Sequence, residues 1–106
     1  MKTTDQSGGP AKPVTSALVT FRLYIAGGAP NSLEAIANLK SICDEFLPNN
    51  HQIETIDVLQ EPLRAVNDGV FVTPMLIKVS PIPVRQMLGN LSNRATVLLT
   101  LDLQGG

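Results

Sequence analysis

The sequence has 106 residues, of which 43% are apolar and 16% are charged, and its formal net charge is −1. A chain of this size folds as one domain around one core, and its charge balance argues against binding to nucleic acid or to an anionic membrane. No apolar run approaches the roughly 20 residues of a membrane span, and residues 1–16 lack the apolar centre of a secretory signal, so we expect a cytoplasmic protein.

Residues 1–16 are polar and rich in glycine and proline. Such a segment buries too little apolar surface to offset the entropy lost on ordering. We therefore expect a disordered leader over residues 1–16, followed by one folded domain over residues 17–104.

The first predicted strand spans residues 18–25. Its residues alternate between two faces, one of which is wholly apolar and should point into a core. The glycine pair Gly27-Gly28 then breaks the strand. The apolar face consists of Val19, Phe21, Leu23 and Ile25.

A helix is predicted over residues 30–47, with Pro30 in its first turn, where the missing backbone donor is no loss. Apolar residues recur at spacings of three and four and form one stripe, and Cys43 lies on this stripe as a small core residue. Pro48 ends the helix. A second strand is predicted over residues 52–59. Because a helix connects it to the first strand, we expect the two strands to pair in parallel.

Residues 61–68 form a predicted short helix with Pro62 in its first turn. An apolar run over residues 70–79 then meets Pro74, which cannot sit inside a central strand, so the next strand begins at this proline. A Thr-Pro pair ahead of a strand is typical of small α/β domains of the thioredoxin type. Thr73-Pro74 is such a pair.

The last quarter of the chain has no unique interpretation. Pro81 and Pro83 exclude a helix and a central strand at their own positions. Residues 84–88 fit either a strand or a helix, and Ser92 is a good helix N-cap. Residues 96–103 alternate cleanly as a strand, yet they also place apolar residues along one helix face. Both possibilities remain open from the pattern alone.

The chain lacks the residues that common catalytic sites need. A thioredoxin-type redox site requires two thiols near the first helix, whereas the loop before this helix has no cysteine. Ser32 has no evident base that would activate it. Gly27-Gly28 matches neither a Walker loop nor a dinucleotide fingerprint, and it is better explained as a tight turn. With His51 as the only histidine, a metal site is improbable. We predict no catalytic residue, cofactor or metal.

Seven short motifs occur in order between about residue 18 and residue 103. They are Phe21-Arg22-Leu23-Tyr24-Ile25-Ala26-Gly27, Pro30-Asn31-Ser32, Ile56-Asp57-Val58-Leu59, Val72-Thr73-Pro74, Pro81-Ile82-Pro83-Val84-Arg85, Gly89-Asn90-Leu91-Ser92-Asn93-Arg94 and Leu101-Asp102-Leu103. In this order and spacing they resemble the KaiB family, the small component of the bacterial circadian oscillator, and the order and spacing make the resemblance specific.

The resemblance implies an α/β domain of the thioredoxin-like family that switches between two folds. One is a ground state ordered βαββααβ, which forms a homo-oligomer (a tetramer or a dimer). The other is a thioredoxin-like monomer ordered βαβαββα, which binds the ATPase ring of KaiC. The implied function is non-enzymatic: a slow fold switch that modulates the phosphorylation state of the ring. A KaiA-like protein or a histidine kinase is a further implied partner.

Two groups of residues are candidates for these roles. Polar residues on or near the second strand and the short helix are candidates for partner binding, namely Arg22, Lys40, Glu54, Asp57, Glu61 and Arg64. Residues in the second half are candidates for the fold switch, namely Pro74, Pro81, Pro83, Gly89 and Asn90.

The sequence departs from the family pattern at two internal positions. Glu34 stands where the family usually has a basic residue, and Asn90 stands where it usually has an acidic one. A charge reversal in the first helix can weaken or redirect partner binding, and a change at residue 90 can shift the balance between the folds. The alternative hypothesis is therefore a stress-response or signalling adaptor that acts outside an oscillator.

Overall fold

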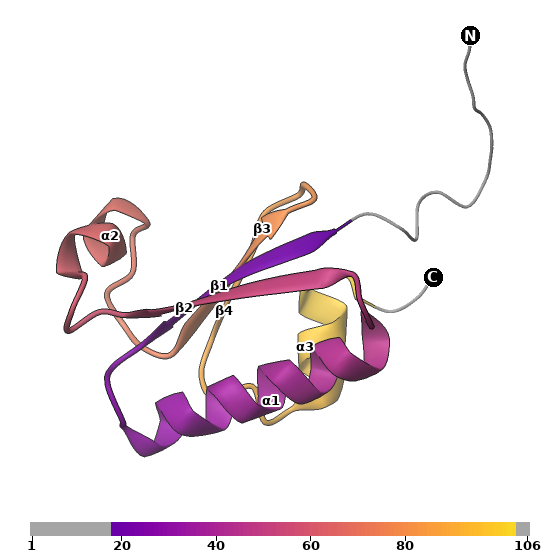
Figure 1. The fold of residues 1–106 in the computed structure, drawn as a ribbon, viewed down its shortest axis with the longest axis horizontal. Coiled ribbons are helices and arrows are strands. Elements are labelled where there is room, and N and C mark those ends of the chain that lie inside the picture. The colour runs from indigo at the N-terminus through magenta and orange to yellow at the C-terminus, as the bar shows by residue number, and fades with distance from the viewer. Residues whose placement is uncertain (1–17, 104–106) are drawn as a thin grey trace, which may run out of the picture.

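The computed structural model describes residues 18–103, so the leader expected over residues 1–16 lies outside the described part of the chain. The elements follow the order βαβαββα, which confirms the predicted α/β thioredoxin-like arrangement (Figure 1). They are β1 (Val19–Ile25), α1 (Pro30–Phe46), β2 (His51–Asp57), α2 (Pro62–Asn67), β3 (Met75–Ser80), β4 (Arg85–Leu88) and α3 (Arg94–Thr100).

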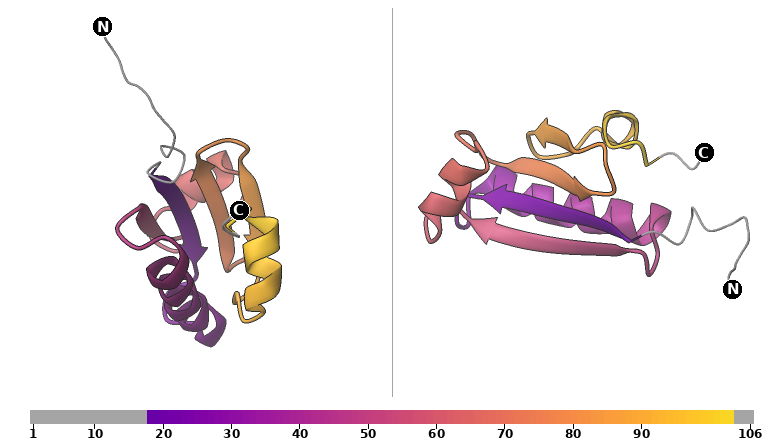
Figure 2. Two further views of the ribbon diagram at one scale, coloured as in Figure 1. Left: turned by 90° about the vertical axis from the view of Figure 1, so that its right-hand side faces the viewer. Right: turned by 90° about the horizontal axis from the view of Figure 1, so that it is seen from above.

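The four strands form one mixed sheet in the order β2-β1-β3-β4. β1 and β2 pair in parallel with Phe21 opposite Ile53, as the strand–helix–strand pattern predicts. β3 pairs antiparallel with β1 and with β4. β2 and β4 are thus the two edges, and β1 is an interior strand. Helices α1 and α3 lie on one side of the sheet, and α2 lies on the other side near one end (Figures 1 and 2).

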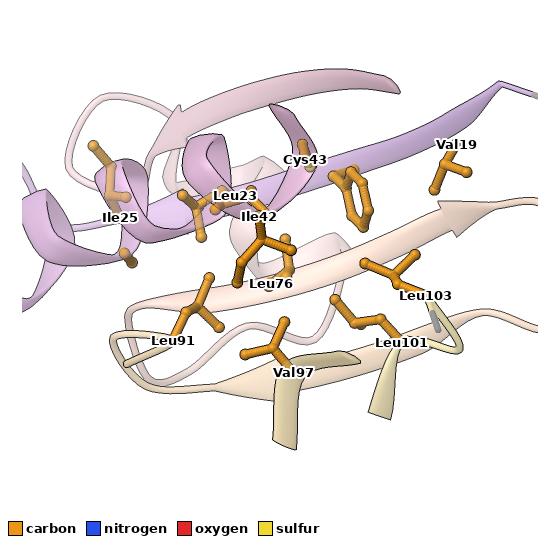
Figure 3. Close-up of a cluster of buried hydrophobic side chains, with 13 residues drawn as sticks. Val19, Leu23, Ile25, Ile42, Cys43, Leu76, Leu91, Val97, Leu101 and Leu103 are labelled. Atoms are coloured by element: carbon orange, nitrogen blue, oxygen red, sulfur yellow. The ribbon is translucent and has the colours of Figure 1, made fainter. Parts of the chain in front are cut away.

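The predicted apolar face of β1 is buried, and it forms the centre of the main core. α1 packs on it through an apolar stripe that includes Leu39, Ile42 and Cys43, and the C-terminal segment contributes Val97 and Leu101 (Figure 3). The full set of buried residues in this cluster is Val19, Phe21, Leu23, Ile25, Ala35, Leu39, Ile42, Cys43, Leu76, Leu91, Val97, Leu101 and Leu103.

The opposite face of β1 is also partly buried. The sequence predicts a mixed polar face there, and the structure leaves Thr20 and Arg22 half-buried while Tyr24 has no exposed surface. Tyr24 belongs to a second apolar cluster beneath α2, whose members are Tyr24, Ile56, Ala65, Val70, Met75 and Ile77. β1 therefore contributes to two cores, one on each side of the sheet.

Local hydrogen bonds explain why two of the predicted helix and strand boundaries are wrong. The second strand ends at Asp57 rather than at residue 59, because the Asp57 carboxylate accepts a hydrogen bond from the Leu59 backbone at 2.9 Å and begins a turn. The cap of α3 is Asn93 rather than Ser92, since the Asn93 side chain accepts from the Thr96 backbone at 3.1 Å.

The run before Pro74 is not strand. Val70 packs beneath α2, whereas Phe71 and Val72 are exposed in the loop that leads to β3. The strand begins at Met75, directly after the buried Pro74. Of the two possibilities for residues 96–103, the structure contains the helix, which ends at Thr100. Pro81 and Pro83 lie in the turn between β3 and β4 and so belong to neither a helix nor a strand, as predicted. The bonds preceding Pro74, Pro81 and Pro83 are all cis.

Cys43 is the single cysteine of the chain, and it is completely buried in the main core. Burial, with a smaller contribution from the neighbouring Asp44 charge, raises the pKa of its thiol to about 12. The thiolate is the reactive form of cysteine, so this thiol is both inaccessible and protonated at neutral pH.

We predict that the native protein does not react with an aromatic disulfide reagent at neutral pH, and that the denatured chain releases one equivalent of chromophore. The measurement is the time course of absorbance with and without denaturant. Reaction of the native protein at the rate of a small free thiol would contradict the burial of Cys43.

Candidate partner-binding surface

Among residues 18–103, no group of three or more histidine, cysteine or carboxylate side chains is placed to hold a metal ion. In the same range, no helix combines the length and apolar content needed to cross a membrane. Ser32 is buried, and its hydroxyl accepts a hydrogen bond from the Ala26 backbone at 3.0 Å. The loop of Gly27 and Gly28 is the predicted tight turn, with Gly27 at a φ of +53°. These residues of the first loop are thus engaged in local structure.

Four of the six partner-binding candidates come together where α2 meets β1 and β2. Arg64 on α2 holds Glu54 on β2 through two bonds, Nη1–Oε2 at 2.7 Å and Nη2–Oε1 at 2.9 Å. Arg22 on β1 lies 3.7 Å from Glu54 and 3.1 Å from the Asp68 carboxylate. Glu61 is a weaker member, with Oε1 3.5 Å from Arg64 Nη1. The hydrogen bond from Arg64 lowers the pKa of Glu54, and the same bond raises the pKa of Arg64.

A buried tyrosine on β1 is hydrogen-bonded to this network of charged residues. The Tyr24 hydroxyl donates to the Asp68 carboxylate at 2.5 Å and approaches the Arg64 backbone carbonyl at 3.3 Å. Burial first, and then the bond to Asp68, raises the pKa of Tyr24 to about 12. The same bond is the main reason that the pKa of Asp68 falls below its ordinary value. Neither Tyr24 nor Asp68 is a predicted site residue; the only sequence signal is a tyrosine on the mixed face of a central strand.

The other two partner-binding candidates have different surroundings. Asp57 accepts hydrogen bonds from the backbone of Gly27 at 3.1 Å and of Leu59 at 2.9 Å, so it ties the turn after β1 to the turn after β2. Lys40 lies on α1, on the far side of the sheet from α2 (Figure 1), and pairs with Asp44 at 3.1 Å. The structure does not bring Lys40 together with the other five candidates.

Five large apolar side chains are exposed around α2, and none of them is a predicted site residue. Leu63 and Val66 project from the helix, Leu59 precedes it, and Phe71 and Val72 follow it. Their exposed fractions range from 57% to 81%. We call these five residues the α2 surface. Exposed apolar side chains that are grouped around one element mark interaction sites more often than isolated ones do. The available signal is the shortness of the helix, because six residues cannot bury an apolar residue on every side.

The fold-switch candidates lie in two places. The Pro74 carbonyl accepts a hydrogen bond from the Gly89 backbone at 2.9 Å, and the Pro81 carbonyl accepts one from Lys78 Nζ at 3.1 Å. Gly89 has a φ of +105°, a conformation that side-chain-bearing residues rarely adopt. Pro83 is exposed in the β3–β4 turn.

Asn90 connects the turn after β4 to helix α1. Its backbone carbonyl accepts from Asn38 Nδ2 at 2.8 Å, and its side-chain amide donates to Glu34 at 2.8 Å. The two positions expected to depart from the family pattern, 34 and 90, are therefore hydrogen-bonded to each other. A second connection lies along the same helix, where Arg94 pairs with Glu45 and donates to Ser41 at 2.8 Å.

Comparison with known proteins gives consistent results at the level of sequence and fold. The family model of the KaiB domain matches residues 22–103. The circadian clock protein KaiB3 of Synechocystis is 45% identical over 85 residues, which are 80% of this chain and 83% of that protein. The circadian clock oscillator protein KaiB of Synechococcus elongatus is 44% identical over 86 residues, covering 81% and 84% of the two chains.

Solved structures show the same architecture at lower identity. The N-terminal domain of Synechococcus elongatus SasA superposes with a TM-score of 0.67 at 20% identity, covering 96% of this chain and 98% of that one. A chloroplastic thioredoxin z superposes with a TM-score of 0.67 at 14% identity, over 88% and 84%. At these identities the likeness establishes the thioredoxin-like fold alone.

We predict that Tyr24 ionises with a midpoint near pH 12 rather than 10, as followed by tyrosinate absorbance; the chain has one tyrosine and no tryptophan. Because the folded pKa is raised above its ordinary value of 10.0, the contribution of Tyr24 to stability is complete below pH 10. It is lost as the pH rises from 10 to about 12. A midpoint near 10 in the native protein would contradict the buried bond to Asp68.

Tyr24→Phe removes the donor to Asp68, and we expect it to lower the free energy of unfolding by about 1.5–3 kcal/mol, as for a hydrogen bond to a charged group. It should also raise the pKa of Asp68, measured by carboxyl NMR. The control is Thr20→Val, which removes a hydroxyl from the same strand at a distance from Asp68. An Asp68 pKa that rises equally in both variants would refute the assignment.

Asn38→Ala removes the side chain that binds the Asn90 carbonyl, and we expect it to lower the free energy of unfolding by about 1 kcal/mol. Urea denaturation measures the effect. Lys40→Ala, on the same helix and exposed, should change stability by much less. Equal effects of the two variants would show that the connection to Asn90 contributes nothing measurable.

Proposed function

The chain belongs to the KaiB family, and from this premise we propose that it is a non-enzymatic clock protein that binds a KaiC-type ATPase ring and modulates the phosphorylation state of that ring. In this proposal the thioredoxin-like form is the binding form, and the α2 surface is what it presents to the ring. The protein acts by docking and does not carry out bond chemistry.

The observation that carries the proposal is the exposure of the α2 surface. Burying one large apolar side chain is worth about 1.5–3 kcal/mol, so five exposed side chains around one short helix provide enough driving force for a specific interface. A surface of this kind, combined with relatives that are circadian clock proteins, favours recognition of another protein over binding of a small molecule.

The charged network beneath α2 supports the same role. Arg64 and Glu54 fix the helix to β2, while Arg22, Tyr24 and Asp68 fix its C-terminal end to β1. A binding element held in place before docking loses little further conformational entropy on docking. Four of the predicted residues would thus act mainly by positioning the α2 surface.

A slow exchange between two folds is the second part of the proposal. The ground state would be the βαββααβ homo-oligomer, a tetramer or a dimer, and residues 96–103 would be strand in that form. Support comes from the apolar pattern of this segment, which fits both the alternation of a strand and the spacing of a helix. Leu99 supports it as well, because this side chain is exposed in the helical form. The exchange would limit how fast the protein engages the ring.

A signalling or stress-response adaptor acting outside an oscillator is the second candidate function. Glu34 favours it, because a carboxylate replaces the basic residue that the family usually carries in the first helix. In that case the docking surface would be the same, and the partner would be a different ATPase, a KaiA-like protein or a histidine kinase.

We predict that the full chain, incubated for hours with a KaiC-type ring from the same genome, co-elutes with the ring on size-exclusion chromatography. Leu63→Asn should weaken binding at least fivefold, because truncating an apolar contact residue in an interface costs about 1 kcal/mol or more. Leu33→Asn is the matched control, since Leu33 is 55% exposed and lies on α1.

The phosphorylation state of the ring, followed over the same period, tests the regulatory half of the proposal. Absence of a complex in every nucleotide state would overturn the clock function and leave the adaptor as the remaining candidate.

A further inference from the structure

We propose that the α2 surface is selective for partners whose apolar contact residues are flanked by lysine or arginine. This inference deepens the proposed function, because it names the chemistry of the protein that the surface recognises. It rests on the distribution of charge around the five exposed apolar side chains.

The sequence around α2 is strongly biased in charge. Arg64 is the only lysine or arginine between Lys40 and Lys78. The same stretch contains six carboxylates, four of which lie on β2 or directly before and after α2. Those four are Glu54, Asp57, Glu61 and Asp68.

The two arginines near α2 are occupied within the molecule. Arg64 forms two bonds with Glu54, and Arg22 pairs with Asp68. Since their positive charge is neutralised there, the carboxylates with weaker ionic contacts determine the character of the rim. Glu61 has only a 3.5 Å contact with Arg64 and remains 46% exposed at the start of α2.

Charge complementarity follows from this arrangement. An acidic rim around an apolar centre repels a partner with its own carboxylates at the edge and attracts one with basic residues there. Such rim contacts contribute modestly to affinity, and they discriminate between partners of similar shape. The occupant of the α2 surface is therefore a protein surface with an apolar centre and a basic border.

The test uses two synthetic helical peptides and the isotopically labelled full chain. Both peptides carry leucines along one face; one has lysines beside the leucines and the other has glutamates. Backbone NMR titration measures which peptide shifts the amides of residues 59–72, and how tightly it binds. We expect shifts in this range with the lysine peptide, affinity that falls with added salt, and at least fivefold weaker binding of the glutamate peptide.

Three variants sharpen the result. Glu61→Gln should weaken binding of the lysine peptide about two- to fivefold, and Leu63→Asn should abolish it. Asp44→Asn removes a carboxylate from the end of α1 that lies far from α2 (Figure 1), and it should change nothing.

The inference is overturned if the glutamate peptide binds as well as the lysine peptide, if neither peptide shifts residues 59–72, or if Glu61→Gln and Asp44→Asn have equal effects. The inference and the proposed function can fail independently of each other. Binding of the lysine peptide without a ring complex would leave the inference standing and remove the ring as partner. A ring complex without a preference for the lysine peptide would do the reverse.

Discussion

The burial of β1 on both faces is the constraint on which the rest of this structure depends. One face is wholly apolar and is covered by α1 and the C-terminal segment. The other carries Tyr24, whose ring is fully buried while its hydroxyl needs a partner. Asp68 meets that need, and because Asp68 caps the C-terminal end of α2, satisfying one buried hydroxyl also fixes the position of a helix. A polar group in the smaller core thus determines where the exposed α2 surface lies.

α2 itself shows why a binding surface arises at this place. The helix has six residues and buries only Ala65 among its own side chains. A helix this short is not stable by its own hydrogen bonds, so it depends on the bonds to Glu54 and Asp68 that hold it to the sheet. Leu63 and Val66 are 76% and 57% exposed, so most of their apolar surface is not used in that attachment. Apolar residues that do not stabilise the fold are available for a partner, and the ionic network allows the helix to retain them.

The first half of the fold could be predicted from sequence because one periodicity dominates in each segment. Alternation in residues 19–25 and the three-and-four spacing of α1 each allow a single answer, and the parallel pairing follows from their order. The α2 surface could not be predicted in the same way. Charged residues can be identified as candidates from sequence alone. The exposure of Leu59 or Phe71 cannot, because it depends on how few contacts a short helix and its loops make in the folded chain. The separation of Lys40 from Arg64 likewise depends on which side of the sheet each helix occupies.

The second half could not be assigned from sequence for a physical reason. As a strand, residues 96–103 would place Val97, Leu99, Leu101 and Leu103 on one face. The structure instead buries Val97 in α3 and Leu101 at the end of that helix, and leaves Leu99 65% exposed. The helical form therefore gives up the burial of one leucine, worth about 1.5–3 kcal/mol, and gains the Asn93 cap together with the contacts of Arg94 and Asn90 to α1. Each of these contributions is on the order of 1–3 kcal/mol, so the apolar pattern of the segment does not by itself select its conformation, and contacts with α1 contribute to the selection. Residues 34, 38 and 90 lie at those contacts, and positions 34 and 90 are the two at which the sequence is expected to depart from the family pattern.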